Sequence, residues 1–343
     1  MLDQAPDLTQ VAGWLPIVFM AVMGLAMLVY VILDGFDLGI GVLMHRASET
    51  DKDTMLSSIG PFWDANETWL VMGVGILLTV FPLAHGVILG SLYLPVAVML
   101  VGLTLRGVAF DFRVKAHVDN KTMWNRSFYY GSLLASWSQG YMLGALITGF
   151  NNSWPVKIFN TVIGLALIAA YCLLGATWLI MKTEGMLQLQ AVAWARKSLI
   201  ITGVGIAAIS VVTPLVSHEI FSKWFSFPNI ILLFPIPAFT LVLFVMTFRS
   251  LKRLPVRLKQ ANEYGAWAPF VLVVGIFVLA FYGLAFSLFP WLVIDQLTVW
   301  QSATSPEAMV VIFVGAAVVM PIIVGYTVYS YRVFWGKTKA LNY

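Results

Sequence analysis

Nine apolar stretches alternate with shorter polar segments along the chain. Each stretch is long enough to form a helix across a hydrocarbon core about 30 Å thick. The pattern therefore predicts an all-α integral membrane protein with one polytopic membrane domain, residues 1–343, and nine transmembrane helices. We place these helices at about residues 14–36, 61–83, 86–106, 127–149, 157–181, 198–217, 227–249, 267–289 and 308–331.

The basic residues predict how these helices are oriented. Of 20 Lys and Arg residues, 18 lie in alternate gaps between the apolar stretches, and only Lys157 and Lys223 lie in the other gaps. The positive-inside rule then predicts an N-terminus outside and a cytoplasmic C-terminus, with Lys337 and Lys339 in the cytoplasm. Counting helices suggests two four-helix bundles plus one extra helix, although no internal repeat supports this division.

Composition agrees with a membrane protein and limits the partners. The chain is 60% hydrophobic and 10% charged, with a mean hydropathy of +0.88. Its net charge of +4 does not indicate nucleic-acid binding, because the basic residues lie in short loops where they set orientation and meet anionic lipid. The segment before Trp14 lacks the positive region of a secretory signal, so we expect the first helix to be retained.

Four acidic residues gather where the first two predicted helices meet the cytoplasmic boundary. Asp34 and Asp37 end the first stretch, and Asp64 and Glu67 begin the second. Each pair is spaced i, i+3 and so shares a helical face. Because carboxylates at membrane depth are costly, they usually face protein and serve a function. We expect one polar cluster that handles protons.

Structural alternatives remain open for each of these residues. Asp64 follows Pro61 and could be a stabilising charge in the first turn of a helix. Asp34 and Asp37, placed by the hydrophobic pattern at a helix end beside glycines, could simply bond to the backbone. Arg106, at the end of the third stretch, could be the counter-charge of the acids or could reach out to lipid phosphates.

The histidines do not indicate a metal centre. A haem-bearing membrane subunit needs axial ligands that project into the bundle, whereas the pattern places His45, His85, His117 and His218 in loops or at helix ends. We therefore predict that this chain ligates no metal on its own. In the fourth stretch Gln139 lies among small residues, where it can form a polar contact between helices or line a partner surface.

Five motifs occur between residues 30 and 145: DGFDLG at 34–39, PFWDANETW at 61–69, FPLA at 81–84, RGVAF at 106–110 and QGYMLG at 139–144. In this order and spacing they resemble subunit II of cytochrome bd-type quinol oxidases. The block 61–69 is the most specific part, and it looks closer to the cyanide-insensitive branch of that family. Beyond residue 145 the likeness rests on helix number and length.

The resemblance implies a subunit of a respiratory terminal oxidase in the cytoplasmic membrane of a bacterium or archaeon, which oxidises quinol and reduces O2 to water. Its partner would be subunit I, which carries the b-type haems, the haem d or its substitute and the quinol site; a small single-helix subunit, lipids and quinone are further expected partners. By motif position, Asp64 belongs to a cytoplasmic proton pathway and Trp63 lies near the haem edge.

A second class of function stays open from the residues alone, namely a proton-coupled secondary transporter. Such proteins use helices broken near the midplane, and Pro235 and Pro237 in the seventh stretch are candidates for such a break, with Pro321 a candidate kink in the ninth. The acids gather at one membrane face, however, which suits proton uptake better than alternating access.

Overall fold

The computed structural model describes residues 7–115, 120–216, 218–260 and 262–338, so the predictions for His117 and Lys339 lie outside the described residues. Within these ranges nine helices have 18 residues or more. They are α1 (Val11–Leu43), α3 (Trp63–Val80), α4 (Pro82–Lys115), α5 (Lys121–Ile147), α6 (Trp154–Lys182), α7 (Gly185–Val216), α10 (Pro235–Lys259), α11 (Ala268–Leu288) and α13 (Pro306–Val333).

Short elements connect the long helices. They are the 3₁₀ helix η1 (Met44–Arg46), α2 (Glu49–Ser57), α8 (His218–Phe225), α9 (Asn229–Leu233), strands β1 (Trp291–Val293) and β2 (Leu297–Thr298), and α12 (Val299–Ser302). The two strands pair antiparallel, with Trp291 opposite Thr298. The expectation of an all-α chain therefore misses one small hairpin, which lies in a connection too short to give a hydrophobic pattern.

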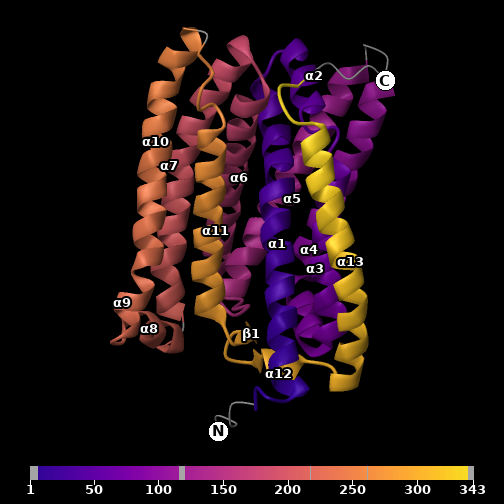
Figure 1. The fold of residues 1–343 in the computed structure, drawn as a ribbon, viewed down its shortest axis with the longest axis vertical. Helices are drawn as coiled ribbons and strands as arrows, with labels where there is room; N and C mark the ends of the chain where they lie inside the picture. Colours follow the sequence, from indigo (N-terminus) through magenta and orange to yellow (C-terminus); the bar gives the residue numbers. More distant parts are fainter. Residues whose placement is uncertain (1–6, 116–119, 217, 261, 339–343) are drawn as a thin grey trace.

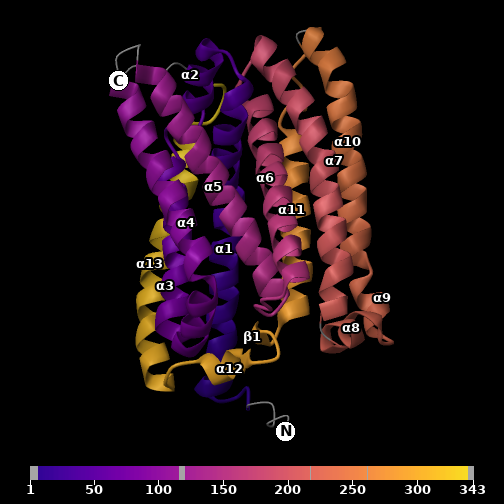
Figure 2. The ribbon, with the colours of Figure 1, turned by 180° about the vertical axis from the view of Figure 1, so that it is seen from behind.

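The long helices run side by side and form one elongated bundle (Figures 1 and 2). Seven of them are long and apolar enough to cross a membrane, and α3 and α5 are not among these seven. Both carry polar residues that face the protein: Asn66 on α3 and Asn125 and Ser136 on α5 are buried. Together with the charged residues Asp64 and Glu67 on α3 and Lys121 and Arg126 on α5, they lower the mean hydropathy of these two helices.

Helix packing follows a simple order. Helix α1 packs against α3, α5 and α6, while α4 packs against α5; α6 and α10 both pack against α7 and α11. Helix α13 lies at the edge, where it touches α1 and α3 (Figure 1). The arrangement places the second half of α1 in the centre of the bundle, so any polar residue on that half is surrounded by protein.

Glycines allow α1 and α6 to approach closely. A Cβ at Gly39 would collide with the carbonyl of Tyr171, and one at Gly175 would lie 2.7 Å from the backbone nitrogen of Ile40. Beside this crossing the rings of Phe36 and Trp178 stack with centroids 4.2 Å apart. Small residues at a helix crossing let backbones come together and so strengthen packing between membrane helices.

The helices extend beyond the apolar stretches that predicted them. Helix α1 continues to Leu43 instead of ending near residue 36, α4 continues to Lys115, and α7 begins at Gly185. The prediction that Asp34 and Asp37 lie at a helix end is therefore wrong, because both lie inside α1. A hydrophobic stretch ends where polar residues begin, but the backbone hydrogen bonds of a helix continue through them.

The predicted helix at 227–249 is divided. Helix α9 ends at Leu233 and α10 begins with Pro235 in its first turn, where a proline fits without loss of a hydrogen bond. Pro235 thus starts a helix and does not break one near its middle. Pro321 does lie inside α13, as its place in the ninth stretch suggests.

Candidate functional site

A buried guanidinium joins three helices. Arg106 of α4 is 1% exposed, and one of its terminal nitrogens lies 2.5 Å from Oδ1 of Asp34 on α1. Its other terminal nitrogen pairs with the carboxylate of Glu67 on α3, whose side chain is 29% exposed. A buried charge is tolerated when it is paired and hydrogen-bonded. Arg106 therefore acts as the counter-charge of two acids from two other helices.

A third carboxylate lies one helical turn further along α1. Asp37 is fully buried, and its Oδ2 accepts a hydrogen bond from Nδ2 of Asn66 at 2.8 Å. The same nitrogen is 3.4 Å from the carbonyl of Leu33, and the hydroxyl of Tyr331 on α13 donates to Oδ1 of Asn66 at 3.1 Å. The other oxygen of Asp37 has no hydrogen-bond partner among the described residues.

Together these residues form a buried acid cluster, defined here as Asp34, Asp37, Glu67, Arg106 and Asn66. Three carboxylates face a single guanidinium, so the cluster holds more acidic groups than one positive charge can balance. Surplus negative charge at this depth is costly. A group of this kind is suited to binding and releasing protons, because a proton on one carboxyl relieves the imbalance.

A separate hydrogen-bonded group lies beside the buried acid cluster. Tyr30 lies one turn before Asp34 on α1, and its hydroxyl accepts a hydrogen bond from Nε2 of Gln139 on α5 at 2.7 Å. The hydroxyl of Tyr171 on α6 donates to Oε1 of the same amide at 2.6 Å. Gln139 thus forms a polar contact between helices, with two tyrosine partners that no sequence pattern indicated.

The other two residues selected from the sequence lie at the edge of this region. Asp64 is in the first turn of α3, is exposed, and forms no ion pair with a residue that the structure describes. Trp63 is half-buried and its ring lies 5.0 Å from that of Phe110, centroid to centroid. The structure brings Asp34, Asp37, Glu67 and Arg106 together. Asp64 lies at the surface of α3, the helix that also carries Glu67.

Sequence reasoning also missed Asn66 and Tyr331, which lie in the hydrogen-bond network around Asp37. Asn66 stands inside the quoted block 61–69, so its place between Asp64 and Glu67 was an available signal. Tyr331 lies 265 residues further along the chain, in a stretch that offered no motif. Only the packing of α13 against α3 brings the two together.

A second polar cluster binds α2 to the ends of α4 and α5. Glu49 accepts hydrogen bonds from Lys52 at 2.6 Å and from Asn125 at 2.9 Å, and Arg113 reaches Asp53 at 2.7 Å. The hydrogen bond from Lys52 is the largest cause that lowers the pKa of the Glu49 carboxyl. Burial opposes it, and the charge of Lys52, the amide of Asn125 and the charge of Arg113 add to the lowering. This cluster fixes a connecting helix and does not touch the buried acid cluster.

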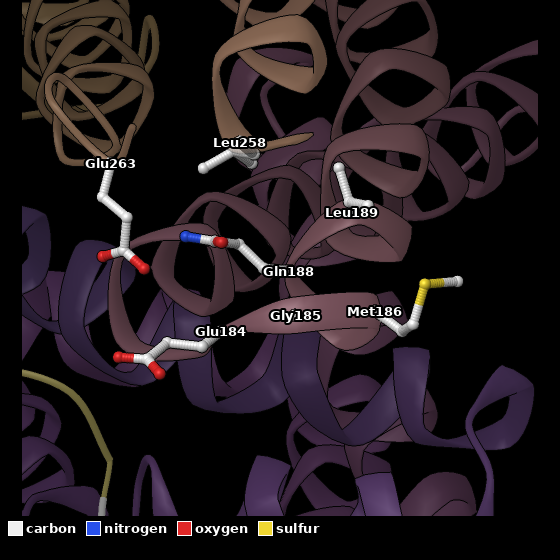
Figure 3. A pocket seen from close by; sticks show the side chains of 7 residues that line it. All are labelled: Glu184, Gly185, Met186, Gln188, Leu189, Leu258 and Glu263. Atoms are coloured by element: carbon white, nitrogen blue, oxygen red, sulfur yellow. The ribbon is translucent and has the colours of Figure 1, made fainter. Parts of the chain in front are cut away.

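A cavity of about 360 Å³ lies at the same end of the bundle, between the α6–α7 and α10–α11 connections (Figure 3). Its lining includes the carboxylates of Glu184 and Glu263, and Glu263 pairs with Lys337 at 2.9 Å. None of the site residues selected from the sequence lines it. Within the described residues, no group of three or more His, Cys, Asp or Glu side chains could hold a metal ion.

The fold and the buried acid cluster define a class: a polytopic helical membrane protein with ionisable groups buried near one end of its bundle. Residues 15–334 match the family described as "Cytochrome bd terminal oxidase subunit II". The chain belongs to this family.

Relatives cover nearly the whole chain. It is 26% identical to cytochrome bd ubiquinol oxidase subunit 2 of Bacillus subtilis (strain 168) over 88% of this chain and 90% of that protein. It is also 26% identical to cytochrome bd-I ubiquinol oxidase subunit 2 of Escherichia coli (strain K12), over 92% and 93% respectively. The fold resembles the solved structure of bd oxidase from Geobacillus thermodenitrificans, with a TM-score of 0.74, 18% identity and coverage of 94% and 98%.

Proposed function

We propose that this chain is the subunit of a bd-type respiratory oxidase that supports a haem-bearing subunit I and supplies protons from the cytoplasm for the reduction of O2 to water by quinol. The observation that carries the proposal is the surplus of buried carboxylates around Arg106, in a chain of the subunit II family. The names of the relatives, which are ubiquinol oxidase subunits, support the substrate class.

The proposed topology has nine transmembrane helices, with the N-terminus outside and the C-terminus in the cytoplasm. Two observations support it. The last turns of α4, α6, α10 and α13 all carry Lys or Arg, and α1 begins at the opposite end of the bundle from the end of α13 (Figure 1). We further propose two four-helix groups, α1, α3, α4, α5 and α6, α7, α10, α11, with α13 as the extra helix. The two groups share a close boundary, because α6 also packs against α1 and α5.

Haem b and haem d, or a b-type substitute, belong to subunit I in this proposal. The described histidines of this chain do not fit axial ligation, because His45 is in η1, His85 is in the first turn of α4, and His218 begins α8. Each lies near an end of the bundle. Trp63, half-buried beside the exposed Asp64, is the proposed residue nearest the haem edge of the partner. A small single-helix subunit, lipid and quinone complete the proposed partners.

The proposed proton route begins at Asp64 and continues through the buried acid cluster. Asp64 is exposed and can exchange protons with water, whereas Glu67, one turn deeper, is partly exposed and already pairs with Arg106. Arg106 then joins Glu67 to Asp34, with Asp37 one turn along α1. Uptake of protons from the cytoplasmic side makes each turnover electrogenic when the protons of quinol are released on the opposite side of the membrane.

The test compares Asp64→Asn and Asp64→Glu in the purified complex, reconstituted in proteoliposomes. We expect Asp64→Asn to assemble with normal haem content but to slow quinol-driven oxygen uptake by about tenfold or more, a barrier increase of ~1.4 kcal/mol. Asp64→Glu should retain much of the rate, because it keeps a group that can transfer protons.

Glu307→Gln is the matched control, since Glu307 is also an exposed acid in a first helical turn, that of α13 at the other end of the bundle. This change should leave oxygen uptake unaltered. Near-normal oxygen uptake and membrane potential in Asp64→Asn would mean that Asp64 transfers no protons and only stabilises the first turn of α3. An optical spectrum without haem bands in the purified complex would instead favour the secondary transporter.

A further inference from the structure

We propose that Tyr331 is a positioning residue that fixes the hydrogen bond between Asn66 and the buried Asp37. The inference rests on the proposed function, in which Asp37 belongs to the proton route, and adds to it a residue on the outermost helix. No hydrogen bond joins Tyr331 to Asp37 among the described residues. It acts through the amide of Asn66, which it contacts at 3.1 Å.

The ring of Tyr331 is held independently of its hydroxyl. It stacks on Phe62 with centroids 4.4 Å apart and planes 20° from parallel, and it meets the edge of Trp178 at 6.0 Å. Phe62 is 2% exposed and Trp178 is also 2% exposed. Because these contacts involve the ring alone, replacing Tyr331 by Phe removes one hydrogen bond and leaves the packing in place.

The C-terminal end of α13 is anchored to the connection between α6 and α7. The ammonium of Lys182 donates to the carbonyl of Phe334 at 2.7 Å, and the backbone nitrogen of Thr338 donates to the carbonyl of Lys182 at 2.8 Å. Lys337 donates to the carbonyl of Thr183 at 2.8 Å. These bonds lie within one or two turns of Tyr331 and fix its place along α3.

The hydroxyl of Tyr331 is the hydrogen-bond donor for the side-chain oxygen of Asn66. An Asn side chain has one oxygen that accepts and one nitrogen that donates. The carbonyl of Leu33 can only accept, so the nitrogen must point toward Leu33 and Asp37, and the oxygen must point toward Tyr331. Asn66 is fully buried, so an oxygen without a donor costs free energy in this place.

Loss of the hydroxyl leaves the buried oxygen of Asn66 without a donor, so the amide is then held through its nitrogen alone. We expect the amide to shift and its hydrogen bond to Asp37 to change in length or angle. The environment of Asp37 changes although no residue in contact with it has been replaced. A merely structural role for Tyr331 predicts no such change, because the aromatic packing with Phe62 and Trp178 is kept.

The experiment is a double-mutant cycle read by infrared difference spectroscopy of the purified complex after a pH jump. The carboxyl stretch of Asp37 is assigned by its loss in Asp37→Asn. Tyr331→Phe should shift this band, and Asn66→Leu should shift it further. In the Asn66→Leu background, Tyr331→Phe should have no additional effect, because the amide that transmits its influence is gone.

Tyr329→Phe is the matched control, since Tyr329 lies on the same helix and is 66% exposed. It should leave the band unchanged. The proposal is overturned by an unchanged Asp37 band in Tyr331→Phe, or by an equal shift with and without Asn66. If the band is too weak to assign, the midpoint of thermal unfolding is measured for the same single and double variants. Additive effects of Tyr331→Phe and Asn66→Leu on this midpoint overturn the proposal.

Oxygen uptake separates this proposal from the proposed function. We expect Tyr331→Phe to lower kcat by about threefold with KM for quinol unchanged, since it touches no quinol site. A shifted, non-additive band together with normal oxygen uptake in Asp37→Asn keeps Tyr331 as a positioning residue and removes Asp37 from the proton route. An unchanged band in Tyr331→Phe together with slow oxygen uptake in Asp37→Asn keeps Asp37 in the proton route and overturns the positioning role of Tyr331.

Discussion

Arg106 and Asp34 lie 72 residues apart in the chain and form a buried ion pair. Asp34 is 0% exposed, and Arg106 is among the largest fully buried side chains of the protein. The guanidinium uses its second terminal nitrogen for Glu67, so α1, α3 and α4 share one charge network. The pair lies in the centre of the helix group that also carries the quoted motifs.

Arg106→Leu should destabilise the protein by about 3–5 kcal/mol, because it leaves buried carboxylates without their counter-charge. The midpoint of thermal unfolding of the purified complex measures this. Arg126→Leu is the control, since Arg126 on α5 is exposed. The triple variant Asp34→Asn, Glu67→Gln, Arg106→Gln removes all three charges and should recover part of the loss. An unchanged midpoint of thermal unfolding in Arg106→Leu would mean that the guanidinium does not stabilise the buried carboxylates.

Glu49→Gln should loosen α2 at neutral pH but not in acid. The pKa of Glu49 is lowered in the folded protein, chiefly by the hydrogen bond from Lys52, so its carboxylate stabilises α2 above the ordinary pKa of about 4.3. That stabilisation is lost as the pH falls through the lowered pKa. Hydrogen exchange of residues 49–57, corrected for intrinsic rates, should differ between variant and wild type at pH 7 and converge once the pH falls below the lowered pKa of Glu49. A difference in hydrogen exchange that persists in acid contradicts the stabilising role of the Glu49 carboxylate.

The sequence predicts the cores of the long helices better than their ends. Helix α6 (Trp154–Lys182) and α11 (Ala268–Leu288) begin and end within three residues of the predicted 157–181 and 267–289. Helix α1 runs seven residues past its predicted end at 36. Apolar stretches report which residues contact lipid or core, whereas a helix in water or between protein neighbours continues through polar residues for the sake of its backbone hydrogen bonds.

For the site, the sequence groups the acids correctly at one end but does not say which of them meet. Asp64 and Glu67 share a nominal face at i, i+3, yet only Glu67 pairs with Arg106, and Asp64 is exposed. The difference depends on how α3 is rotated against α4, which the side-chain packing of both helices decides. The contact of Tyr331 with Asn66 likewise depends on tertiary packing alone.

Gln139→Leu should cost about 1 kcal/mol, because it leaves the hydroxyls of Tyr30 and Tyr171 without their partner. Hydrogen bonds between membrane helices average ~0.6 kcal/mol, with a maximum near 1.7. In the Gln139→Leu background, replacing both tyrosines by Phe should recover stability, since no buried hydroxyl is then unpaired. Thermal midpoints of the wild type, of Gln139→Leu and of the triple variant test this. A further loss on removing the hydroxyls would show that they have other partners.

Gly39→Ala should separate α1 from α6 and reduce assembly of the complex. A Cβ at Gly39 would meet the backbone carbonyl of Tyr171, which cannot move aside as a flexible side chain can. The shift would also disturb the stack of Phe36 on Trp178 beside the crossing. Overpacking of this kind costs about 1–3 kcal/mol or more.

Gly75→Ala on α3 is the matched control, because its Cβ would meet nothing within 4 Å. The yield of haem-containing complex and its thermal midpoint should fall for Gly39→Ala and stay at wild-type values for Gly75→Ala. Equal values for the two variants would show that α1 and α6 do not depend on their close approach.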